Sequence, residues 1–208
     1  MKNEIPIYAI DFEGSKSLGI VEFAIVGISD GEIFGLESAI CAPRQKISAR
    51  DAEFFGITNK EASAHPPLES HAELFCGLRS CGIFAAHSCQ AENTMLRSHI
   101  PSPGRVKNYF NGEQTLEWAP WIDSRKIAKA VLPNLKSEKL ADVVSELSLF
   151  EELEFCAQKW CPEGRRKWHC APYDALASAL IIKHALPQIA GVGELARING
   201  ESCENLFS

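Results

Sequence analysis

Short apolar runs alternate with amphipathic stretches along the chain. Ile5–Ile10 is brief, rich in β-branched residues and nearly all apolar, which predicts a strand buried on both faces. Ile20–Ile28 and Glu32–Ile40 predict two more strands, and Asp30-Gly31 between them predicts a hairpin turn. We expect these three strands to form an antiparallel meander.

Later parts of the pattern predict two further strands set among helices. The strands are Ile83–Ala86 and Trp121–Asp123, and a polar loop, Pro101–Gly112, lies between them. Helices are expected over Leu68–Leu78, after His87, from Asp123 or Ser124 to just before Pro133, near Glu138–Leu147, near Glu151–Ala157, and from about Ala171. Beyond Pro187 the pattern fits either a short terminal helix or a loose tail. The order predicts one α/β domain over residues 1–208, with a core of about 5–186 and a tail of 187–208.

Composition agrees with a single domain that can bury a core. The chain has 208 residues, of which 46% are hydrophobic. Since no apolar run approaches the roughly 18 residues of a spanning helix, we expect no membrane segment. The N-terminal segment lacks the architecture of a signal peptide, which favours a cytoplasmic location. The eight cysteines are therefore expected to be reduced and mostly buried.

Charge argues against a protein that coats nucleic acid through a general positive field, because the net charge is −6. The basic residues are clustered instead. Arg165, Arg166 and Lys167 directly precede His169 and are the favoured candidates for phosphate contact. A solvated loop is an equally open interpretation of this cluster.

Two acidic residues follow the first apolar run. Side chains alternate along a strand, so Asp11 and Glu13 point to the same side where the strand leaves the core. Two converging carboxylates repel each other unless a cation lies between them. Hard oxygen ligands without neighbouring Cys or His favour Mg²⁺ or Mn²⁺. The alternative is a solvated strand end.

Two downstream segments carry further candidate groups. Ile83–Ala86 leads into His87 and then a helix that carries Glu92. His169 and Asp174 stand five apart, and Pro172 suits the first turn of a helix, so Asp174 is expected to be fixed on that turn. His169 then lies on the preceding loop, where a general base can close over a substrate.

These pieces together carry a family resemblance. They are Asp11-Phe12-Glu13 after a strand, His87 to Glu92 after a strand, and His169 with Asp174 at the opening of a helix. They resemble the D-x-E, H-N-x-x-F-D and H-x4-D motifs of the DEDD superfamily of 3′–5′ exonucleases, in its DEDDh branch. That branch includes the proofreading subunit of bacterial DNA polymerase III, ribonuclease T, oligoribonuclease and the TREX enzymes.

Two connecting segments agree with the same family. FFGIT (Phe54–Thr58) resembles its H-G-I-T segment, and WIDSRKIAKAVLP (Trp121–Pro133) resembles its strand-Asp-Thr-helix-Pro stretch. The resemblance spans roughly Ile5 to Leu186 with all segments in the family's order. It implies a ribonuclease H-like fold with a mixed five-stranded sheet, an antiparallel meander plus parallel strands, flanked by helices.

The resemblance also implies a reaction and a set of site residues. The reaction is 3′–5′ exonucleolytic release of nucleoside 5′-monophosphates by a two-metal-ion mechanism with a histidine base. Asp11, Glu13, Glu92 and Asp174 would bind two Mg²⁺ ions, which Mn²⁺ can replace, and His169 would be the general base. Substrate contacts are expected from Phe12, Gly14, Ser15, Leu18, His87, Arg165 and Arg166. The expected partners are single-stranded 3′ ends of DNA or RNA. Association with a DNA polymerase is a further possibility at this point, and the oligomeric state, monomer or homodimer, is left open.

Three departures from the family pattern bear on these expectations. Glu92 stands where the family has Asp, and Ser88 and Ala91 replace the Asn and Phe of the same motif. The loop after Glu13 is also shorter than in the family. An exoribonuclease, a 3′-end-binding module and a metal-dependent phosphatase or endonuclease therefore remain as alternatives.

For two further polar residues, His87 and Asp123, we expect a structural role. For His87 we favour a structural hydrogen bond over catalysis. Asp123 precedes a predicted helix and suits an N-cap better than a metal site.

Overall fold

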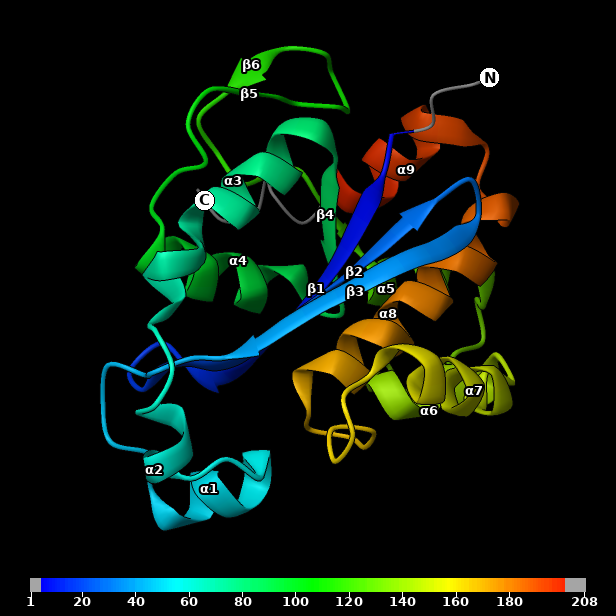
Figure 1. Ribbon diagram of the computed structural model, residues 1–208. Coiled ribbons are helices and arrows are strands. Elements are labelled where there is room, and N and C mark those ends of the chain that lie inside the picture. Colours follow the sequence, from blue (N-terminus) through cyan, green and yellow to red (C-terminus); the bar gives the residue numbers. More distant parts are fainter. Residues whose placement is uncertain (1–4, 201–208) are drawn as a thin grey trace.

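A mixed five-stranded sheet forms the centre of the computed structural model, which describes residues 5–200 (Figure 1). The strands are β1 (Ile7–Ser15), β2 (Gly19–Ser29), β3 (Glu32–Ile40), β4 (Ile83–Ala86) and β7 (Trp121–Asp123), in the order β3-β2-β1-β4-β7. The first three form an antiparallel meander, and β4 and β7 run parallel to β1. This confirms the predicted α/β class and sheet.

Helices cover both faces of the sheet. They are α1 (Ala49–Phe55), α2 (Asn59–Ala62), α3 (Ala72–Cys81), α4 (Cys89–His99), α5 (Ser124–Val131), α6 (Leu140–Glu146), α7 (Phe150–Trp160), α8 (Ala171–Ala185) and α9 (Gly191–Gly200). In Figure 1, α3 and α4 lie to the left of the sheet and α6, α7 and α8 to its right. Two 3₁₀ turns, Leu68–His71 and Leu186–Gln188, and a ribbon of β5 (Val106–Lys107) with β6 (Gln114–Thr115) complete the described chain.

Alternation along β1 divides the core into two layers. Ala9 packs with the apolar side chains of α8, whereas Tyr8, Ile10 and Phe12 pack on the other face, toward α3 and α4. Helix α8 is buried almost along its whole length because the sheet covers one side and α5, α6 and α7 cover the other. Odd-numbered residues of β1 thus face α8.

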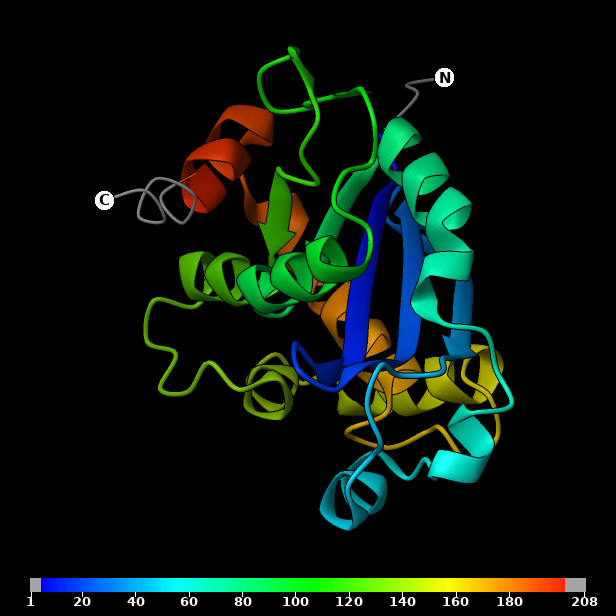
Figure 2. The same ribbon diagram turned by 90° about the vertical axis from the view of Figure 1, so that its left-hand side faces the viewer.

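A smaller apolar cluster lies beside α1 and α2. It contains Leu18, Val21, Ile47, Phe55, Ile57 and Ala62. Figure 2 shows these two helices beyond the lower ends of the central strands. The cluster joins the turn after β1 to the segment that follows β3.

Several predicted boundaries change in the structure. The first strand extends from Ile7 to Ser15, so Asp11 and Glu13 lie within it and not after it. The helix expected from Leu68 begins as a 3₁₀ turn and becomes α-helical at Ala72. Of the two alternatives for the tail, residues 191–200 form a helix, while the rest of it lies outside the described residues. No helix within residues 5–200 is both long and apolar enough to cross a membrane.

Candidate active site

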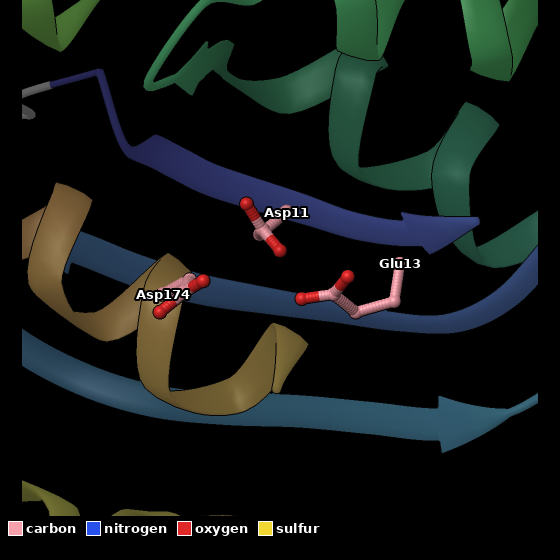
Figure 3. A group of neighbouring side chains, drawn as sticks. All are labelled: Asp11, Glu13 and Asp174. Carbon is pink, nitrogen blue, oxygen red and sulfur yellow. The ribbon is translucent and has the colours of Figure 1, made fainter. Parts of the chain in front are cut away.

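Three carboxylates meet between β1 and α8. Asp11 and Glu13 project from β1 toward α8, and Asp174 projects back from the first turn of that helix (Figure 3). One oxygen from each side chain lies within 4.8 Å of the other two. Pro172 stands at the start of α8, where its missing N–H costs no helical hydrogen bond, and so fixes the helix start that aims Asp174.

Glu92 extends this cluster from the opposite layer. It lies in the first turn of α4, which follows the end of β4, and its side chain is buried at 7% exposure. Its charge raises the pKa of Asp11, and the charge of Glu13 raises the pKa of Glu92. The longer side chain of Glu92, in place of the family's Asp, thus still comes within electrostatic reach of the cluster.

Burial and mutual repulsion disfavour the charged forms of these acids. Burial, followed by the charges of Asp174 and Glu22, raises the pKa of Glu13 to about 8, and Arg165 partly opposes this shift. Burial also raises the pKa of Asp174 to about 7 and that of Asp11 well above its ordinary value. Such a cluster is stable in its ionised form only with positive charge among the carboxylates.

The donor atoms fit a hard divalent cation. Asp174 Oδ1 and Glu92 Oε2 are buried and have no hydrogen-bond partner among the described residues. The carboxylates of Asp11, Glu13 and Asp174 form an all-oxygen donor set, the kind that Mg²⁺ or Mn²⁺ prefers, and the orphaned Glu92 oxygen has the same chemistry. The residues present therefore fit the expected ions.

His169 lies at the rim of the cluster. Its backbone N–H donates to Asp174 Oδ2 at 3.2 Å, and its backbone has a positive φ of 64°. The imidazole is exposed and packs against the ring of Phe54 of α1 in a tilted arrangement, with ring centroids 4.2 Å apart. The loop before α8 thus holds the backbone of the predicted base against Asp174, while its ring lies against Phe54.

Arg165 makes contacts other than those expected. Its guanidinium is paired with Glu22 of β2 and also donates to the carbonyl oxygen of Phe55. Three of its five N–H donors are thus used within the protein, one on each nitrogen. Contact with substrate phosphate stays a prediction. Arg166 is exposed, and its Nε donates to the Cys161 carbonyl at 3.1 Å.

Glu22 was missed by the sequence analysis although a signal was present. Every residue of β2 except Ser29 is buried, and Glu22 is the only charged residue in that strand. A lone acid in an apolar strand has to be paired when it is buried. Glu22 lies opposite Glu13 in the β1–β2 register, so its position beside the site follows from the hairpin.

Two residues expected to make apolar contacts with substrate bases have buried side chains. Phe12 points to the opposite face from Asp11 and packs on Phe75, because alternate side chains of a strand face opposite ways. Leu18 is buried in the cluster beside α1 and α2, where it packs with Val21 and Phe55. Neither side chain is presented to a ligand.

The turn after β1 is held by its own contacts. A Cβ on Gly14, whose φ is 140°, would lie 2.2 Å from the carbonyl oxygen of Gly19, so only glycine fits. The Ser15 hydroxyl accepts a hydrogen bond from the Leu18 N–H at 3.0 Å, while the side chain stays exposed. Substrate contacts by Gly14 and Ser15 stay predictions.

The structural interpretations of His87 and Asp123 are confirmed. The two ring nitrogens of His87 lie 2.8 Å from Ser124 Oγ and 2.8 Å from the Glu138 carbonyl oxygen. Burial holds the pKa of His87 below its ordinary value. Asp123 is the N-cap of α5, where its carboxylate accepts from the Arg125 N–H. Both residues fix the end of the parallel strands, and a substrate contact by His87 stays a prediction.

Several solved structures with this architecture are exonucleases. A structure of exonuclease X with 5′-overhanging duplex DNA matches at a TM-score of 0.64 and 20% identity, covering 94% of this chain and 99% of that one. The fold is that of the ribonuclease H-like exonucleases. Among structures of this fold, a 3′-exonuclease that recognises a histone mRNA stem-loop has a TM-score of 0.64 and 16% identity, covering 90% of this chain and 84% of that one. Escherichia coli exonuclease I with a dT13 oligonucleotide has a TM-score of 0.60 and 16% identity, covering 89% of this chain and 42% of that one.

Two curated relatives match this chain at low identity. DNA polymerase III PolC-type of Mycoplasmopsis pulmonis is 20% identical over 212 residues, and that of Clostridium perfringens is 23% identical over 190 residues. These matches cover 100% and 90% of this chain but only 13% and 11% of the relatives' own length. No family model matches the chain. In sequence motifs and in fold, the chain resembles the DEDD-type exonucleases.

Proposed function

We propose that this chain is a metal-dependent 3′–5′ exonuclease that removes nucleoside 5′-monophosphates from single-stranded or frayed 3′ ends of DNA. The observation that carries the proposal is the convergence of Asp11, Glu13 and Asp174, with buried Glu92 beside them and His169 at the rim. These residues lie in three separate motifs, on β1, on α4, and on the loop and first turn of α8, which an accidental acidic surface does not require.

The site residues divide the chemistry among them. Asp11, Glu13, Glu92 and Asp174 would hold two Mg²⁺ ions, or Mn²⁺ in their place. When bound, such ions polarise a phosphodiester and offset the negative charge that builds on its oxygens. The imidazole of His169 accepts the proton of the attacking water at a ring nitrogen. The hydrogen bond from His169 N–H to Asp174 supports the backbone of that residue at the edge of the carboxylate cluster.

An RNA substrate is the leading alternative. One solved structure of this fold is of a 3′-exonuclease that recognises a histone mRNA stem-loop, whereas two others are complexes with DNA. A pure 3′-end-binding module is less favoured, because it has no use for an exposed imidazole beside a carboxylate cluster. The PolC-type relatives support association with a polymerase as part of the proposal.

The test is product analysis on matched 5′-labelled single strands of DNA and RNA. With Mg²⁺ we expect a ladder that shortens from the 3′ end, release of 5′-monophosphates and no reaction in EDTA. Circular single-stranded DNA is the matched control and should stay intact. Internal cleavage of the circle would indicate an endonuclease, and release of inorganic phosphate alone would indicate a phosphatase; either result would contradict the proposal.

A further inference from the structure

A buried ion pair joins the loop before α8 to the sheet. Arg165 Nε donates to Glu22 Oε1 at 2.8 Å, and Arg165 Nη2 donates to Glu22 Oε2 at 2.5 Å. The side chains are only 13% and 3% exposed. A two-pronged guanidinium–carboxylate contact fixes the relative orientation of both groups. Burying two charges carries a large desolvation cost. We therefore asked which segments this pair connects.

The same two side chains hold two further segments. Arg165 Nη1 donates to the carbonyl oxygen of Phe55 at the end of α1, at 2.8 Å. Glu22 Oε2 also accepts from the N–H of Ala171, the first residue of α8, at 2.8 Å. Four segments, namely β2, α1, the loop before α8 and α8 itself, therefore meet at one ion pair.

Each of these segments leads directly to a group of the candidate site. Phe54, next to Phe55, packs against the imidazole of His169. Asp174 lies in the same helical turn as Ala171. Glu13 lies opposite Glu22 across the β1–β2 pairing. The ion pair thus lies behind the site and touches its supports.

We propose that Glu22 and Arg165 are positioning residues that hold the His169 loop and the first turn of α8 against the carboxylate cluster. We call this pair the Glu22–Arg165 clamp. Its effect on turnover rests on the proposed nuclease function, whereas its effect on the loop does not. Apolar side chains of similar size would fill the same space but make none of these directional hydrogen bonds.

The first test measures the loop directly, without metal or nucleic acid. The variant Glu22→Leu/Arg165→Met removes both charges, so it leaves no unpaired buried ion, and such replacements are often neutral for stability. The control Lys183→Gln removes an ion pair with Glu152 from the other end of α8. We expect backbone hydrogen exchange in residues 162–170 to be at least about tenfold faster in the double variant than in the control.

Equal exchange in the two proteins would overturn the clamp, whether or not the chain degrades nucleic acid. If the double variant does not fold, Arg165→Lys replaces it. A lysine keeps the charge opposite Glu22 but cannot make the fork contact and also reach the Phe55 carbonyl. Faster exchange in Arg165→Lys than in Lys183→Gln would support the clamp, and equal exchange would overturn it.

The second test separates positioning from phosphate contact by steady-state kinetics on a single-stranded oligonucleotide. The clamp predicts a kcat at least about tenfold lower in the double variant, with KM changed less than about threefold. A raised KM with unchanged kcat would mean that Arg165 contacts phosphate, which overturns the clamp. The clamp would also be overturned if the double variant showed faster exchange in the loop but kept the wild-type kcat. An inactive wild-type protein would refute the nuclease proposal, and the exchange result would then decide the clamp alone.

Discussion

The acidic side chains show how burial sets the chemistry of single residues. Without a cation, Glu13 and Asp174 have pKa values of about 8 and about 7, chiefly because burial removes water from their carboxylates. Both groups therefore carry protons over much of the neutral range. A cation has to displace these protons, so metal affinity is expected to rise with pH across this range.

Neutralising Glu13 should stabilise the metal-free protein at alkaline pH. Its pKa is raised on folding from about 4.5 to about 8, so its contribution to stability is complete below about 4.5 and is lost as pH rises through about 8. Glu13→Gln carries no charge at any pH. Melted in EDTA, it should exceed the wild-type Tm by at least about 2 °C at about pH 8.5, and the difference should be much smaller at about pH 5. An equal loss of Tm at both pH values would mean that the Glu13 carboxylate is stabilised in its ionised form.

The sequence alone predicted that most of the carboxylates of the candidate site lie together. Strand alternation placed Asp11 and Glu13 together, and the Pro172 signal placed Asp174 on the first turn of α8; the structure brings all three into one cluster. The same alternation, applied one residue further, would have turned Phe12 into the core. The contact between Glu22 and Arg165 could not be predicted from spacing, because it joins residues 143 apart in the chain.

At the scale of elements, one buried arginine organises a long connection. Arg79 of α3 is fully buried and donates to three backbone carbonyls of the segment between α4 and β7. They belong to Lys107, Trp118 and Ala119, at 2.9, 2.9 and 2.7 Å. Arg79 thereby satisfies carbonyl groups in a segment that has little regular secondary structure of its own.

Replacing this arginine should destabilise the fold strongly. Arg79→Met keeps the apolar stem but leaves the three carbonyls without their donor, so unfolding free energy in urea should fall by about 3 kcal/mol or more. The control Arg97→Met removes a half-exposed ion pair with Glu117 and should cost less than about 1 kcal/mol. Similar losses in the two variants would show that the Arg79 contacts are not structural supports.

Long periodic elements were predicted better than short ones. The five strands of the sheet and helix α8 were expected, whereas α1, α2 and the β5–β6 ribbon were not. Short helices depend on tertiary contacts and caps more than on periodicity. Their caps were visible in the sequence: Ser48 accepts from the Asp51 N–H and Thr58 from the Glu61 N–H, three residues on in each case.

At the scale of the whole molecule, the sheet brings distant motifs to one place. The order β3-β2-β1-β4-β7 puts β1 at the centre, beside β4, with α4 reaching over from one layer and α8 from the other. With a net charge of −6, the chain as a whole does not attract phosphate. We therefore expect cations bound at the site, and not the overall charge of the protein, to attract the substrate.

The most direct test of the carboxylate cluster as the catalytic metal site is a rate measurement. The rate is that of release of the 3′-terminal nucleotide from 5′-labelled single-stranded DNA at saturating Mg²⁺. Asp11→Asn and Glu92→Gln each replace a carboxylate by an isosteric amide and should reduce the rate at least about a hundredfold. Asp30→Asn changes a hairpin residue with a positive φ of 52°, which asparagine tolerates, and should stay within about twofold of wild type. If folded Asp11→Asn kept more than about a tenth of the wild-type rate, the carboxylate cluster would not be the catalytic metal site.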